Sequence, residues 1–261
     1  MTAPTIIFDV EPPVALLTFS RPEARNALTW EMYEGLVDAC ERVDGRADVR
    51  VFVLKGAGGK AFASGTDIAQ FASFTSRDDA IGYERRLDAV LDRLERVRAA
   101  TIAQVQGVAT GGGCAIALAC DLRVCTPDTR FGMPIARTLG NCLSAANYAR
   151  MLDLLGTART RELLLTGRLI AAGEAAALGL VARVIEPSAI DAEVRGLAAT
   201  IAANAPLTIR ATKEALRRIH AARRLPDGAI DDLIAECYLS EDFKEGVAAF
   251  LAKRSPTFRG R

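Results

Sequence analysis

The sequence lacks the residues on which several common catalytic mechanisms depend. Its 261 residues include one histidine, His220, and six cysteines that form no CxxC pair and no spacing typical of a metal site. His220 stands in a basic stretch that indicates an exposed helix, so a Ser-His-Asp or Cys-His mechanism is not expected. We predict neither a metal ion nor a prosthetic group.

A charge imbalance and long apolar runs are also absent. The 33 basic and 32 acidic residues give a net charge of +1, which favours neither a nucleic-acid nor a membrane partner. No apolar run could span a bilayer, and residues 1–4 lack the start of a secretory signal. Cysteines without a disulfide pattern fit a reducing compartment, so we expect a cytoplasmic protein.

The patterns that are present predict an α/β core followed by helices. Half of the residues are hydrophobic, which is enough for one large domain with its own core. Alternating apolar residues, capping residues and turns predict strands at 6–10, 14–19, 51–54, 101–105 and 122–125, with helices beginning after Thr29 and Ser76. From about residue 189 the pattern is helical, and the last helix is predicted at 243–254. We divide the chain into a core at 1–195 and a helical segment at 196–261.

Two glycine-rich turns, at 56–68 and 104–114, each follow a buried strand and lead into a predicted helix. The first lacks the spacing of a phosphate loop, and the second lacks that of a dinucleotide-binding turn. Each turn by itself is explained by glycines that adopt positive φ or pack closely. Together, however, backbone N–H groups at two such helix starts can converge on one oxygen, which would form an oxyanion hole.

Several motifs, read in order, resemble those of the enoyl-CoA hydratase/isomerase (crotonase) family. The resemblance extends from about residue 5 to 258, and the combination of motifs is specific although no single motif is. The segments that carry it are 21–28, 60–68, 106–114, 119–123, 131–134, 165–167 and 242–246.

The resemblance implies a crotonase-like fold, a spiral of repeated ββα units with a C-terminal helical segment for trimerisation. It also implies an acyl-CoA substrate, with coenzyme A as part of the substrate, and a homotrimer or a dimer of trimers. The backbone N–H groups of Thr66 and Gly112 would hold the thioester carbonyl as it becomes an enolate. The coenzyme A site would comprise these two residues with Arg25, Ala63, Asp67 and Ile68, and with Phe250 and Lys253 from a neighbouring subunit.

Two departures from the family's pattern concern its acid–base residues. Hydratases of the family carry a glutamate after the Gly-Gly-Gly-Cys run and another after the Phe-Gly-x-Pro turn. Here Ala115 and Ile135 stand at these positions, and neither side chain can exchange protons. Moving the alignment gap brings no carboxylate into place, because the alternatives are Ala136, Arg137 and Thr138.

Three hypotheses fit a pocket without these glutamates. The first is decarboxylation, which needs no base, with Arg137 either binding a substrate carboxylate or forming an ordinary salt bridge. The second is a hydratase or isomerase with displaced acids. Its candidate residues are Glu84 and Asp88 as acids, Tyr83 beside them, and Cys142, Ser144 or Asn147 to position water. The third is a non-catalytic coenzyme A thioester binder, a structural subunit or an RNA-binding protein, although the near-neutral charge argues against RNA. The acyl group has no readable signature.

Overall fold

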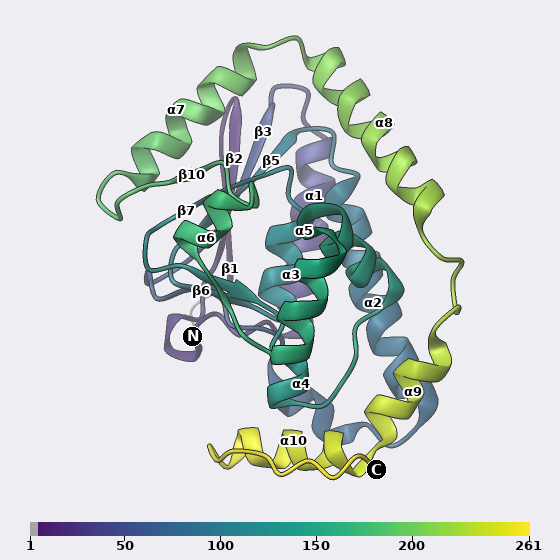
Figure 1. The fold of residues 1–261 in the computed structure, drawn as a ribbon. Helices are drawn as coiled ribbons and strands as arrows, with labels where there is room; N and C mark the ends of the chain where they lie inside the picture. Colours follow the sequence, from purple (N-terminus) through teal and green to yellow (C-terminus); the bar gives the residue numbers. More distant parts are fainter. Residues whose placement is uncertain (1–4) are drawn as a thin grey trace.

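The computed structural model describes residues 5–261, and its strands form two sheets (Figure 1). The expectation for residues 1–4 lies outside the described part of the chain. In the six-stranded sheet the order is β1 (Ile6–Glu11), β2 (Val14–Phe19), β3 (Val51–Gly56), β5 (Ala100–Val105), β7 (Leu122–Cys125) and β10 (Arg183–Val184). In the four-stranded sheet it is β4 (Ala61–Ala63), β6 (Val108–Thr110), β8 (Arg130–Gly132) and β9 (Ile170–Ala171).

A repeated unit connects the two sheets. Strands β3, β5 and β7 of the larger sheet are each followed by a strand of the smaller sheet and then by a helix. Successive units pair their strands in parallel, from β2 through β10 in the larger sheet and from β4 through β8 in the smaller one. The antiparallel hairpin of β1 and β2 precedes them, as the sequence predicts. The predicted crotonase-like spiral of ββα units is therefore confirmed.

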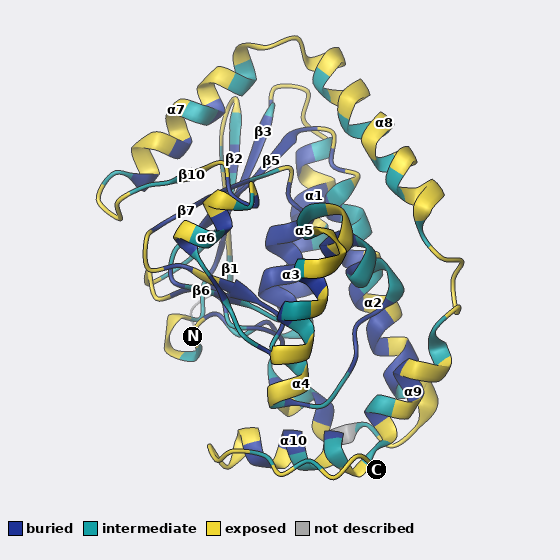
Figure 2. Ribbon diagram, viewed as in Figure 1, coloured by how far each residue is buried: buried dark blue, intermediate teal, exposed yellow. Residues whose placement is uncertain are grey.

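The helices of the first part begin at the predicted capping residues. Thr29 accepts a hydrogen bond from the Met32 N–H, and Ser76 with Asp79 forms a complete capping box. The helices are α1 (Trp30–Asp44), α2 (Arg77–Glu95), α3 (Gly112–Ala119), α4 (Ile135–Thr138), α5 (Ala145–Thr166) and α6 (Ala172–Ala177), with short 3₁₀ helices η1 (Pro22–Ala24) and η2 (Ile68–Ser73). All eight residues of α3 are buried, so this helix is central to the core (Figure 2).

The C-terminal helices form an arc around the core (Figure 1). They are α7 (Ile190–Ala203), α8 (Pro206–Arg223), α9 (Asp231–Leu239) and α10 (Glu241–Leu251). Helix α8 has no buried residue (Figure 2). It carries the partly exposed His220, whose Nδ1 lies 2.6 Å from Oδ2 of Asp153. The division proposed between residues 195 and 196 falls inside α7.

The last helix differs from its predicted range, 243–254. It begins earlier because Ser240 caps it by accepting from the Phe243 N–H. It ends earlier because Lys253 adopts a left-handed conformation with φ of 53° just after the C-cap.

Two further searches of residues 5–261 concern membranes and metals. No helix there combines the length and hydrophobicity required to cross a bilayer. The same residues contain no group of three or more His, Cys, Asp or Glu side chains arranged to hold a metal ion.

Candidate active site

A cavity of about 800 Å³ opens where the two glycine-rich turns meet. Its wall is formed by both turns, by α2, by parts of residues 133–147 and by the end of α10. The wall has more apolar than polar surface, as is usual in sites for small molecules. We take this cavity as the candidate active site.

The side chain of Asn26 holds the backbone of the first glycine-rich turn in place through hydrogen bonds. Its side chain is fully buried and donates to the Ala57 carbonyl at 3.0 Å and to the Ala61 carbonyl at 2.8 Å, while its Oδ1 accepts from the Arg21 N–H at 2.9 Å. The backbone of Asn26 has a φ of 55°, a conformation that asparagine tolerates better than most residues. These bonds explain why an asparagine stands in the motif at 21–28.

The second turn packs against the first with almost no space between them. A Cβ built at Gly111 would lie 3.5 Å from the Gly65 Cα, and one built at Gly113 would collide with Ala63. The Thr110 hydroxyl also donates to the Ser64 carbonyl at 3.1 Å. Gly113 is thus required for the close approach of the two backbones, whereas Gly111 has space for a Cβ but adopts a φ of 51° that favours glycine.

The N–H groups of Thr66 and Gly112 are both available to a ligand at this junction. Leu28 bonds to the two neighbours of Thr66, donating to the Gly65 carbonyl and accepting from the Asp67 N–H, both at 2.8 Å. In this parallel pattern the Thr66 N–H points away from Leu28. Gly112 is the first residue of α3, where an N–H has no carbonyl partner within its helix. Both residues line the cavity.

Two tyrosine hydroxyls support the side chain of Thr66. Its Oγ1 lies 2.9 Å from the Tyr33 hydroxyl and 2.7 Å from the Tyr83 hydroxyl. Burial raises the pKa of both tyrosines, so both remain neutral at physiological pH. Tyr33 also lies against Gly112, where an added Cβ would collide with the tyrosine hydroxyl. The sequence analysis did not identify Tyr33, because a tyrosine on the apolar face of a helix is ordinarily a core residue.

The two positions at which the family resemblance leads us to expect glutamates both face the cavity. Ala115 lies in the first turn of α3 and is buried, and Ile135 begins α4 and is partly buried. Both line the cavity together with Thr66 and Gly112. The wall is therefore apolar at these two points.

A different carboxyl group, Glu84 of α2, lines the same cavity. Its side chain is 3% exposed, and burial raises its pKa to about 8. Oε1 accepts from the Tyr238 hydroxyl at 2.5 Å, and Oε2 accepts from the Ser144 N–H at 3.0 Å. Of the two displaced acids considered from the sequence, Glu84 reaches the cavity, whereas Asp88 is not part of its wall.

The opening of the cavity brings together most residues expected to bind coenzyme A. Arg25, Asp67, Ile68, Phe250 and Lys253 line it. Ala63 does not, because it is fully buried beneath Gly113.

Phe250 and Lys253 come from the same chain as the rest of the cavity. Helix α10 packs beside η2 of its own chain, which brings both residues to this cavity. Their contribution to the cavity of a neighbouring subunit stays a prediction, because a single chain is described.

Arg137 lies away from the cavity. It is exposed on α4, and its Cβ packs near Gly167, whereas its neighbours Ile135 and Thr138 turn toward the cavity. Of the loop residues considered for positioning water, Asn147 lines the cavity and Ser144 and Cys142 do not. The Ser144 hydroxyl instead caps α5 and donates to Asp88 at 2.7 Å.

Comparisons with known proteins agree with this geometry. A model described as enoyl-CoA hydratase/isomerase matches residues 9–261. A "Probable enoyl-CoA hydratase" of Mycobacterium bovis is 34% identical over 263 residues, covering 100% of both chains. The (E)-benzylidenesuccinyl-CoA hydratase of Thauera aromatica is 37% identical, with 98% of this chain and 99% of the relative covered. A crystal structure of methylmalonyl-CoA decarboxylase complexed with 2S-carboxypropyl-CoA is 26% identical, covers 100% of both chains and has a TM-score of 0.90.

Proposed function

The chain belongs to the enoyl-CoA hydratase/isomerase family, and on that basis we propose that it converts an acyl-CoA thioester through an enolate. The N–H groups of Thr66 and Gly112 hold the thioester oxygen as it becomes negative, and the start of α3 adds a favourable dipole. The availability of both N–H groups at one junction supports this role. Arg25 and Lys253 at the opening bind the phosphates of coenzyme A.

We propose further that the reaction is a decarboxylation. The observation that carries this proposal is the apolar wall at Ala115 and Ile135, where the hydratases of the family have glutamates. Loss of CO2 leaves its electron pair on the α-carbon, so the enolate forms without a base. Full-length similarity to a methylmalonyl-CoA decarboxylase supports the same reaction class. Arg137 has no part in it, since the residue is exposed outside the cavity.

Hydration or isomerisation by a displaced acid is the second candidate function. One observation favours it: Glu84 lines the cavity and is a carboxyl group that remains largely protonated at neutral pH. The curated relatives with the greater identity are also named as hydratases.

Assembly and location follow from the same family relationship. We propose a homotrimer, or a dimer of trimers, formed through the C-terminal helices. The apolar side chains that α8 exposes, Leu207, Leu216 and Ile219, support a covered face there. All six cysteines are free thiols, which supports a cytoplasmic location.

The test is a pair of assays on purified protein. With methylmalonyl-CoA, we expect release of CO2 and formation of propionyl-CoA in proportion to enzyme. With crotonyl-CoA, we expect no loss of the enoyl-thioester absorbance. Rapid hydration of crotonyl-CoA without CO2 release would replace the first candidate with the second. Binding of coenzyme A without turnover of either thioester would indicate a non-catalytic binder.

A further inference from the structure

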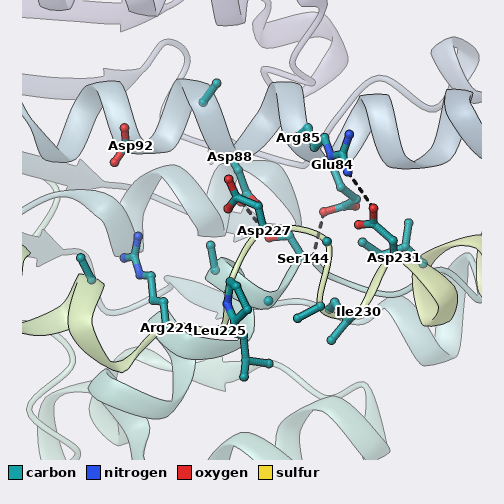
Figure 3. A pocket seen from close by; sticks show the side chains of 18 of the residues that line it. Glu84, Arg85, Asp88, Asp92, Ser144, Arg224, Leu225, Asp227, Ile230 and Asp231 are labelled. Carbon is teal, nitrogen blue, oxygen red and sulfur yellow. Dashed lines mark hydrogen bonds and ion pairs between the residues drawn. The ribbon is translucent and has the colours of Figure 1, made fainter.

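A second cavity of about 540 Å³ lies behind Glu84. It is enclosed by α2, by the start of α5 and by the segment between α8 and α9. Figure 3 shows Glu84 and Asp88 extending from α2 toward Ser144, with Arg224 and Asp227 on the opposite side. Asp88, Arg150 and Arg224 place charged groups in the wall of this outer cavity, where they can hydrogen-bond to water.

Glu84 separates the two cavities. Among residues 5–261 it is the residue that lines both the acyl cavity and the outer cavity. It directly follows Tyr83, whose hydroxyl contacts Thr66 in the oxyanion turn. A carboxyl group at this position can donate a proton on one side and recover it on the other.

We infer that Glu84 is the acid that protonates the α-carbon of the enolate and is reprotonated by water from the outer cavity. This inference rests on the proposed function. In the decarboxylation, the bond between the α-carbon and the carboxylate breaks, CO2 leaves, and the electron pair becomes the enolate. The enolate then takes the proton of Glu84, the new C–H bond forms, and the Glu84 carboxylate takes a proton from water. The net reaction consumes one proton for each CO2 released.

The hydrogen bonds around Glu84 fit this role. The Tyr238 hydroxyl accepts from Nδ2 of Asn141 at 3.1 Å, so its own proton is directed to Oε1 of Glu84. The acidic proton then resides on Oε2. Both hydrogen bonds to Glu84 come from groups that do not titrate near neutral pH, namely a buried phenol and a backbone amide.

Two groups in this region titrate near neutral pH: Glu84, whose pKa burial raises to about 8, and Cys237, whose hydrogen bond with Cys142 lowers its pKa to about 7. The tyrosines that face it have raised pKa values because of burial; they are Tyr33 of α1, Tyr83 of α2, Tyr148 of α5 and Tyr238 of α9. Cys142, in the loop before α5, has its pKa raised by its hydrogen bond with Cys237, whose own pKa is lowered. The charged groups of the outer cavity are Asp88, Arg150, Arg224, Asp227 and Asp231.

The main experiment measures the configuration of the deuterated product, with the rate of turnover as a second readout. When methylmalonyl-CoA is decarboxylated in deuterium oxide, propionyl-CoA gains one deuterium, which makes its α-carbon a stereocentre. The native enzyme should give a single configuration, because Glu84 delivers the deuteron to one face. Glu84→Gln should slow turnover about 100-fold or more and give a mixture of configurations, since water then protonates the enolate. Asp78→Asn, a change of an exposed α2 carboxylate that lines neither cavity, should alter neither.

The outcomes separate the two proposals. A single configuration from Glu84→Gln would overturn the role of Glu84 and leave the decarboxylation intact. If crotonyl-CoA is hydrated instead, the same deuterium analysis of the 3-hydroxybutyryl-CoA product decides the role of Glu84. Failure of both thioesters, with coenzyme A still bound, would overturn the proposed function and the acid role together.

Two further variants test the role without removing Glu84. The negative charge of Asp88 raises the pKa of Glu84, and the hydrogen bond from Tyr238 lowers it. The rate should fall as pH rises through the pKa of Glu84, because an acid must be protonated. Asp88→Asn should move this fall to lower pH, and Tyr238→Phe should move it to higher pH. Cys237→Ser should leave it in place. A pH profile unmoved by the first two variants would overturn the inference.

Discussion

The Tyr238 hydroxyl donates a 2.5 Å hydrogen bond to Oε1 of Glu84, although 154 positions separate the two residues in the chain. This bond joins α9 of the C-terminal arc to α2 of the core, in the wall of the acyl cavity. The C-terminal helices therefore complete the site as well as covering the core.

The stability of the protein should depend on pH through Glu84. A glutamate in an unfolded chain has a pKa of about 4.3, whereas burial raises the pKa of Glu84 to about 8. The folded state therefore holds the proton more tightly, and this contribution to stability is lost as pH rises from about 4 to 8. The glutamine of Glu84→Gln cannot ionise. As pH rises over this range, the free energy of unfolding of the variant should therefore increase relative to that of the native protein by about a few kcal/mol. Urea denaturation at pH 5 and pH 9 measures the difference.

A control for this measurement is Glu31→Gln, which changes an exposed glutamate of α1. Its free energy of unfolding should change with pH by the same amount as that of the native protein. If the free energy of unfolding of Glu84→Gln also changed with pH as that of the native protein does, the Glu84 carboxyl group would be ionised in the folded protein.

Gly112→Ala should strongly impair turnover. The added Cβ would collide with the Tyr33 hydroxyl and lie 3.1 Å from Oγ1 of Thr66, so either the start of α3 or the side chains that support Thr66 must shift. Displacing one donor of an oxyanion hole lowers turnover by roughly 100- to 1,000-fold. Steady-state kinetics should show the fall in kcat. Gly196→Ala, at an open position in α7, is the matched control and should be fully active.

Asn26→Ala should destabilise the fold by about 2–4 kcal/mol, because it leaves one buried and one partly buried carbonyl group without their donor. Part of this cost arises from placing alanine at a φ of 55°. Asn26→Gly removes the same side chain without that strain, so it should be about 1 kcal/mol more stable than Asn26→Ala. Thermal unfolding of the two variants checks both values, and equal stability would argue against backbone strain at this position.

Lys253→Ala should weaken binding of the thioester without affecting the chemical step. Lys253 lines the opening of the cavity, far along the chain from the proposed oxyanion hole. We expect KM to rise about tenfold with little change in kcat, since the lysine contacts a part of the substrate that does not react. Lys244→Ala, which removes an exposed lysine from α10, the helix that precedes Lys253, should leave KM unchanged. A fall in kcat alone would contradict a binding role.

The sequence was sufficient to predict those features of the structure that depend on residues close together in the chain. The caps at Thr29 and Ser76 and the glycine turns depend on residues close in the chain, so their patterns predict them correctly. It was insufficient for the direction of side chains on short or amphipathic helices. Arg137 was a candidate ligand of the substrate, yet α4 is a single turn that directs its neighbours Ile135 and Thr138 to the cavity instead.

The burial of Glu84 had a signal in the sequence that was not used. Ala80, Glu84, Leu87 and Leu91 recur at the spacing of one helical face, and all four are buried in α2. A carboxylate within an apolar stripe indicates a buried acid. Its partner Tyr238 could not have been found in this way, because the contact depends on how α9 returns to α2 after the whole C-terminal arc.

The origin of Lys253 from its own chain has a genetic consequence. Thr66, Gly112 and Lys253 meet in one cavity of one polypeptide, so each copy carries a complete set of these residues. Two alleles that impair the enzyme for different reasons, turnover at Gly112 and substrate binding at Lys253, would encode subunits with one defective cavity each. Mixing such subunits in one cell would not create a cavity with all three residues intact, and the two alleles would fail to complement.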